Sequence, residues 1–266
     1  ANLVAAARSH DLPIASHVPL MLTADEAGPL ADSMEHLRNI ELACASNWRD
    51  LLDQRRKTIS NFTEGLGYEL RRGLHSAQRL PAIAAYDENR CNEVLDTLHS
   101  TTQVPTLRLN TVFQQQPWTR KDWPAALTNM PDDVASQWQR QIDLLQHTNT
   151  PPDDRFAKWS LFLISRLLER EVPIAAGTDT PIGLGIPGYS LHTELELLVA
   201  SGMTPNQALY AATVAPTHFF GNTKQIGQIK PGMTADLVLL NANPLDDISN
   251  TRNIAAVMSQ GVWAYP

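Results

Sequence analysis

The stretch 172-VPIAAGTDTPIGLGIPG-188 decides how the rest of the chain is interpreted. It begins as an almost continuous apolar run, which is typical of a parallel strand covered on both faces. The run ends at an acidic residue, Asp179, and a loop rich in glycine and proline follows. A carboxylate at the end of a buried strand, beside a loop that can approach a bound molecule, indicates a functional site.

Composition bounds the class of protein. The 266 residues, 43% of them hydrophobic and 18% charged, can bury a large core and are unlike a disordered chain. A net charge of −7, from 21 basic and 28 acidic residues, argues against a nucleic-acid surface. No apolar stretch reaches the roughly 18 residues that span a bilayer, so we expect no membrane segment. Cys44 and Cys91 suggest no disulfide framework, and we expect buried or free thiols.

Short apolar runs alternate with helical patterns along the chain. Besides 172–179, three runs end in a polar residue, at 12–17, 32–36 and 104–108. Strands that alternate with helices predict an α/β fold with a parallel sheet. Segment 48–102 is harder to interpret, and we expect a helical excursion near the mouth of the site. The helices predicted from apolar spacing or capping residues are 88–98, 131–145, 153–170, 191–202 and one that begins at Thr204.

The two ends of the chain differ from its middle. Residues 1–10 resemble the second half of an amphipathic helix and do not begin with Met, so we expect a processed chain or a fragment. From about residue 222 the pattern changes to short strands and turns, including Pro231-Gly232. We therefore predict two parts, an α/β part over 1–221 and a small β part over 222–266.

Three polar side chains stand at the carboxyl ends of predicted strands: His17, His36 and Asp179. In a parallel α/β barrel these ends converge on one face. Imidazole and carboxylate are ligands for Zn²⁺ and related divalent metals. We predict that the three residues hold a divalent metal, with Zn²⁺ as first choice, and that Asp179 also takes a proton from the attacking water. A structural His or a turn-capping Asp is the alternative that spacing alone leaves open.

Arg108 ends the third run and is a candidate for binding a substrate carboxylate, with an ion pair as the alternative. His192 and Glu194 are minor candidates because they follow the 179–188 loop closely. The other histidines are interpreted as surface or packing residues: His10, His75, His99, His147 and His218.

The C-terminal sequence carries a family resemblance. HTELELLVASGMTPNQALYAATVAPTHFFG, followed by GQIKPGMTADLVLLNANPLDDISNTRNIAAVMSQGVW, resembles the C-terminal portion of the amidohydrolase superfamily. Imidazolonepropionase-like and Xaa-Pro dipeptidase-like members are the most similar. The likeness is nearly gap-free over 172–263, and upstream 11-DLPIASHV-18, 32-DSMEHL-37 and 103-QVPTL-107 resemble strands five, six and seven.

The resemblance implies strands five to eight of a distorted (β/α)₈ barrel with a small β-sandwich, and metal-dependent hydrolysis of a C–N bond. It assigns His17 and His36 to one metal, and Asp179 to the roles of ligand and general base. The family's H-x-H pair on strand one has no counterpart, because no two histidines here are two residues apart. We therefore expect a missing N-terminal segment or a second chain to complete the barrel through its exposed strand edges.

Three functions remain in competition. The first is an amidohydrolase, or the C-terminal part of one, acting on a small molecule that contains an amide, a cyclic amide or a dipeptide. The second is a non-catalytic half barrel that serves as an assembly or binding subunit. The third is a deaminase on the same fold.

Overall fold

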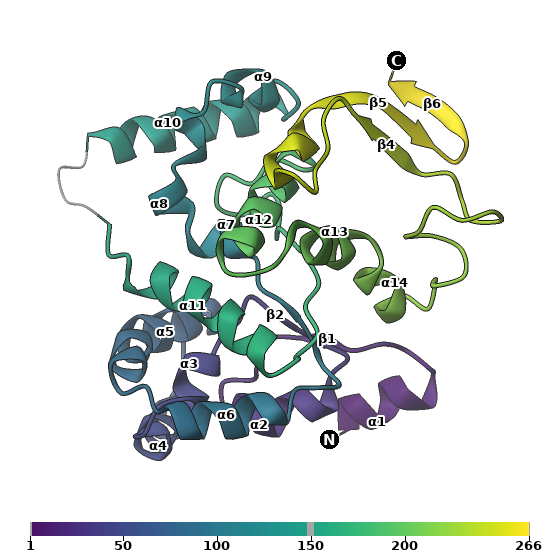
Figure 1. Ribbon diagram of the computed structural model, residues 1–266. Helices are drawn as coiled ribbons and strands as arrows, with labels where there is room; N and C mark the ends of the chain where they lie inside the picture. The colour runs from purple at the N-terminus through teal and green to yellow at the C-terminus, as the bar shows by residue number, and fades with distance from the viewer. Residues whose placement is uncertain (1, 148–151, 266) are drawn as a thin grey trace.

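Four parallel segments form the centre of the computed structural model, which describes residues 2–147 and 152–265 (Figure 1). Strands β1 (Ala15–Ser16), β2 (Ser33–Glu35) and β3 (Thr102–Val104) form one sheet in the order β1-β2-β3. The segment 172–179 joins the free side of β3 through a parallel bridge between Gln103 and Ile174. The segments therefore lie side by side in chain order, and their carboxyl ends share one edge.

Helices connect and cover these segments. Residues 40–96, which contain the helices α3 to α6 between β2 and β3, form a lobe in the lower part of Figure 1, where α1 and α2 also lie. The helices up to β3 are α1 (Asn2–Ser9), α2 (Ala24–Ala27), η1 (Gly28–Leu30), α3 (Ile40–Ala43), α4 (Trp48–Ser60), α5 (Gly67–Ala84) and α6 (Glu88–Asp96). Those after β3 are α7 (Leu107–Asn110), α8 (Val112–Gln115), η2 (Pro117–Thr119), α9 (Trp123–Leu127), α10 (Asp132–Gln146), α11 (Arg155–Glu169), α12 (Tyr189–Ala200), α13 (Pro205–Thr213) and α14 (Ala215–Phe219).

Most helices lie where apolar spacing places them. In α11, Trp159, Leu163 and Leu167 are buried against the parallel segments, as their spacing of four predicts. Thr204 caps α13 in a capping box with Gln207, and Gly202 ends the preceding turn with φ +112°. The excursion predicted within 48–102 is helical, formed by α4, α5 and α6.

Two predictions are corrected by the structure. The third apolar run is displaced, because β3 ends at Val104 and Arg108 lies in the short helix α7. Cys44 and Cys91 are fully buried and joined in a disulfide, not free thiols. They lie 47 residues apart, so only the fold, which packs α3 against α6, brings them together.

The C-terminal part is a small antiparallel sheet, drawn in yellow in Figure 1, of β4 (Leu237–Leu240), β5 (Ile254–Ser259) and β6 (Val262–Tyr265). A short helix, η3 (Ile248–Arg252), precedes β5. Gly232 has φ +89° at the third position of the predicted turn, which Met233 closes by donating to the carbonyl of Lys230. No helix in the described part of the chain is long and apolar enough to cross a membrane.

Candidate active site

His36 lies at the centre of the candidate site, directly after β2. Its Nδ1 is 2.9 Å from the hydroxyl oxygen of Thr106, and its Nε2 is 3.6 Å from Oδ2 of Asp179. His17, which follows β1, places its ring centroid 4.9 Å from that of His36. Thus the three residues predicted from separate strand ends lie together at the carboxyl edge of the sheet.

Strained backbone marks the same place. His36, Thr106 and Asp179 all have positive φ, at 68°, 49° and 51°. A β-branched residue such as Thr106 pays a steric penalty in this conformation, and such residues concentrate at functional sites. The surrounding hydrogen bonds hold them, since the His36 amide donates to the carbonyl of Val104 at 2.7 Å. Three residues with left-handed backbone therefore gather at this edge of the sheet.

Burial sets the protonation of the two histidines. His36 is only 7% exposed, and burial, followed by the nearby charge of Arg38, lowers its pKa to about 4. Burial also lowers the pKa of His17, again followed by Arg38. At neutral pH His36 is uncharged, so one ring nitrogen has a lone pair. When Nδ1 donates to Thr106, that lone pair is on Nε2 and faces the Asp179 carboxylate.

The spacing of His36 and Asp179 suits two ligands of one metal. Their 3.6 Å separation exceeds a normal hydrogen bond. Two ligands bonded at ~2.05 Å to a tetrahedral ion lie about 3.3 Å apart. Thr106 holds the other ring nitrogen of His36, as the partners of metal-ligating histidines do. However, no group of three or more His, Cys, Asp or Glu side chains among residues 2–147 and 152–265 is arranged to hold a metal ion.

Arg108 holds the loop that bears Asp179. Its guanidinium donates to four main-chain oxygens at 2.5–3.0 Å, those of Thr178, Asp179, Ile182 and Gly183. A Cβ on Gly185 would lie 2.5 Å from this guanidinium, so the loop needs glycine there. Four of five N–H donors are therefore occupied, and this geometry does not support the prediction that Arg108 binds a substrate carboxylate.

Glu194 fixes Arg108 in turn. Its two carboxyl oxygens accept the backbone N–H groups of Leu107 and Arg108 at 2.9 and 2.7 Å. Complete burial raises its pKa to about 7 despite these hydrogen bonds. Glu194 thus has no direct contact with Asp179: it holds the backbone of Arg108, and the Arg108 guanidinium holds the carbonyl of Asp179. His192, the other minor candidate, lies 3.0 Å from the Thr251 hydroxyl oxygen and links α12 to η3.

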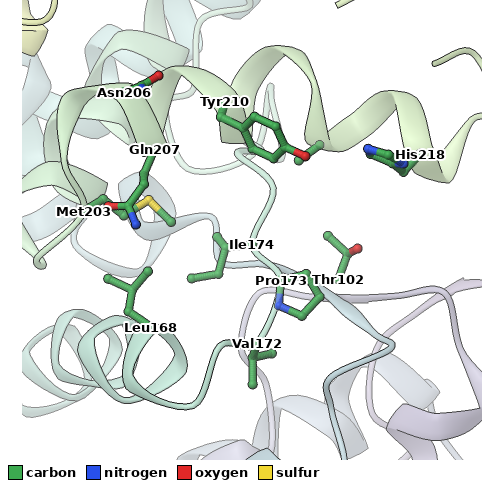
Figure 2. Close-up of a pocket in the computed structure, with 11 residues that line it drawn as sticks. Thr102, Leu168, Val172, Pro173, Ile174, Met203, Asn206, Gln207, Tyr210 and His218 are labelled. Carbon is green, nitrogen blue, oxygen red and sulfur yellow. The ribbon is translucent and has the colours of Figure 1, made fainter. Parts of the chain in front are cut away.

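A cavity of about 410 Å³ lies at the opposite edge of the sheet (Figure 2). Thr102 and Val172, the first residues of their segments, line it together with Tyr210 and His218. In parallel α/β sheets, ligands bind outside the carboxyl ends of the strands. We therefore place the candidate site at His36 and Asp179.

Comparison with known proteins supports the resemblance found in the sequence. Residues 160–264 match the model of the amidohydrolase family. Imidazolonepropionase of Geobacillus kaustophilus (strain HTA426) is 37% identical over 81 residues, which are 29% of this chain and 18% of that protein. Ochratoxinase of Aspergillus niger is 42% identical over 94 residues, which are 35% of this chain and 18% of that protein.

Solved structures extend the likeness over the whole chain. A bottromycin amidohydrolase matches 99% of this chain and 52% of its own, with a TM-score of 0.68 and 21% identity. A. niger ochratoxinase matches 98% of this chain and 44% of its own, with a TM-score of 0.55 and 22% identity. The chain thus spans about half the length of these structures. The chain has the mixed α/β fold of the corresponding part of these solved structures, and its residues 160–264 match the model of the amidohydrolase family.

Proposed function

We propose that the chain is part of a metal-dependent hydrolase that cleaves C–N bonds in amides, cyclic amides or dipeptides. Residues 1–221 would supply strands five to eight of the (β/α)₈ barrel, and 222–266 part of a β-sandwich. Two observations support this division. The four central segments are parallel and lie in chain order, and the chain matches about half the length of the solved bottromycin amidohydrolase.

The observation that carries the proposal is the meeting of His17, His36 and Asp179 at one strained edge. His36 and Asp179 would hold a divalent metal, with His17 beside them. Such an ion polarises a carbonyl group and lowers the pKa of a bound water to about 7. Zn²⁺ suits this mixture of imidazole and carboxylate.

The chain's own residues perform the proton transfers. Asp179 accepts a proton from the attacking water at a carboxylate oxygen, while the water oxygen forms a bond to the carbonyl carbon. It then gives this proton to the leaving nitrogen as the C–N bond breaks. The Arg108 clamp fixes the carbonyl of Asp179 and hence its position. His36 remains neutral and does not compete for the proton, because burial lowers its pKa to about 4.

The remaining strands, and the metal donors absent from the described residues, would come from a missing N-terminal segment or a second chain. Within the described residues no strand pairs with the outer edge of β1 or of 172–179. An apolar cavity of about 530 Å³ lies beside Ile14 and Ala15, along the outer edge of β1. Open edges, one of them beside an apolar cavity, suit further barrel strands.

A non-catalytic assembly subunit is the second candidate, and the finding that no three donors converge in the described chain favours it. Metal analysis separates the two. We expect the parent chain to bind Zn²⁺ in isothermal titration calorimetry. In His36→Ala and in Asp179→Asn the affinity for Zn²⁺ should fall at least tenfold. His10→Ala, which changes an exposed histidine, is the matched control. No metal at any loading, with no hydrolysis of N-acyl amino acids, would favour the assembly subunit.

A further inference from the structure

A basic helix face lies beside the candidate site. Helix α5 carries Tyr68, Arg71, His75 and Arg79 at spacings of three and four, so they share one face. Arg72 and Arg38, which follows His36 by two residues, line the same cavity of about 360 Å³. We call these six residues the arginine pocket.

The protein leaves most of this charge without a partner. Arg79 lies 3.4 Å from Glu41 and stacks on Phe156. By contrast, the side chains of Arg38 and Arg72 make no hydrogen bond or ion pair with any group in the described chain. The Arg71 side chain makes only a cation–π contact there, with its guanidinium carbon 5.3 Å from the centroid of the Tyr68 ring. His75 Nε2 is buried without a hydrogen-bond partner. Such a concentration of positive charge is unusual in a chain of net charge −7 and favours a bound anion.

Backbone geometry connects the pocket to the site. His36, Leu37 and Asn39 have φ of 68°, 55° and 65°, so the chain turns sharply on either side of Arg38. Arg38 lines the arginine pocket and follows His36 by only two residues, so the pocket lies next to the candidate site.

We propose that the arginine pocket binds the carboxylate of the substrate, so that the hydrolase acts on carboxylate-bearing amides such as N-acyl amino acids. This inference rests on the proposed function. Guanidinium groups bind carboxylates in a planar, two-point geometry, and three guanidinium groups with no side-chain hydrogen bond or ion pair in the described chain line this cavity. Arg108, by contrast, has only one N–H left to offer.

Binding of benzoate to the chelator-treated full chain tests the proposal without hydrolysis. Ligand-observed NMR titration should detect benzoate, while benzamide, of the same shape without charge, should bind at least tenfold more weakly. Arg38→Gln and Arg71→Gln should each weaken benzoate binding about tenfold, which corresponds to ~1.4 kcal/mol. Arg140→Gln, which removes the same charge from an exposed position on α10, should change the affinity less than twofold.

Equal binding of benzoate and benzamide, or unchanged affinity in both pocket variants, would overturn the inference. Thermal unfolding of each variant excludes misfolding as the cause of lost binding. The outcome is separate from that of the proposed function. Benzoate binding by a chain that binds no metal would keep the anion site and reject the hydrolase. Hydrolysis of neutral amides by a chain that does not bind benzoate would keep the proposed hydrolase and reject the anion site.

Discussion

The Arg108 clamp makes the sharpest prediction of this structure. Arg108→Gln removes four charged hydrogen bonds to the loop and the positive charge beside buried Glu194. At about 1.5 kcal/mol each, the bonds alone would sum to about 6 kcal/mol. This sum is too large, because loop carbonyls freed near the surface gain water. We expect a loss of about 3–4 kcal/mol, near the cost of breaking one side of a buried ion pair.

Arg108→Lys separates charge from shape. Lysine keeps the charge near Glu194 but cannot span four carbonyl groups, so we expect a smaller loss, about 2 kcal/mol. Urea unfolding measures the global effect, and hydrogen exchange of the amides in 178–186 measures the loop. Both variants should exchange these amides faster than the parent chain. Arg108→Gln within 1 kcal/mol of the parent, with unchanged exchange, would refute the clamp.

Three further predictions concern stability. Gly185→Ala should lower the stability in thermal unfolding by about 1–3 kcal/mol, because the added Cβ would lie 2.5 Å from the Arg108 guanidinium. Gly73→Ala in α5 is the control: a Cβ there has no atom within 4 Å, so it should stabilise the chain by up to ~1 kcal/mol. Equal effects of the two substitutions would reject the steric argument. Because the pKa of Glu194 is raised from its ordinary value of 4.5 to about 7, the folded chain holds a proton that the unfolded chain releases between these two pH values. In that window the free energy of unfolding should fall as pH rises, by up to ~1.4 kcal/mol per pH unit. The difference in unfolding free energy between the parent and Glu194→Gln should show that slope, and a flat difference would contradict it. Finally, the denatured, unreduced chain should show no free thiol in a thiol assay, and two free thiols would exclude the disulfide. Because Cys44–Cys91 joins residues 47 positions apart, its reduction should lower the free energy of unfolding by about 2–4 kcal/mol.

The sequence predicted those features that depend on local pattern. Apolar spacing places α11 and α12, and the capping box places α13. The ends of the apolar runs place His17, His36 and Asp179 correctly at one edge, because parallel strands share their carboxyl ends.

Features that depend on distant contacts could not be predicted in the same way. Thr106 carries no signal until its hydroxyl oxygen is seen beside His36, and the disulfide depends on the packing of α3 against α6. The apolar run QVPTLR predicts a strand that continues to Arg108, but the left-handed backbone at Thr106 starts a helix instead. The basic spacing of Arg71, His75 and Arg79 was a usable signal, since steps of four define one helix face.

The disulfide gives the helical lobe a property of its own. Cys44 and Cys91 bring the two ends of the intervening segment to within 4.2 Å between Cα atoms. That segment contains α4 and α5, and so the basic face, but none of the central strands. A protease cut inside it would leave both pieces covalently attached until a reductant is added. The closeness of its ends also means that a segment of different length and sequence can replace this lobe without moving the central parallel strands.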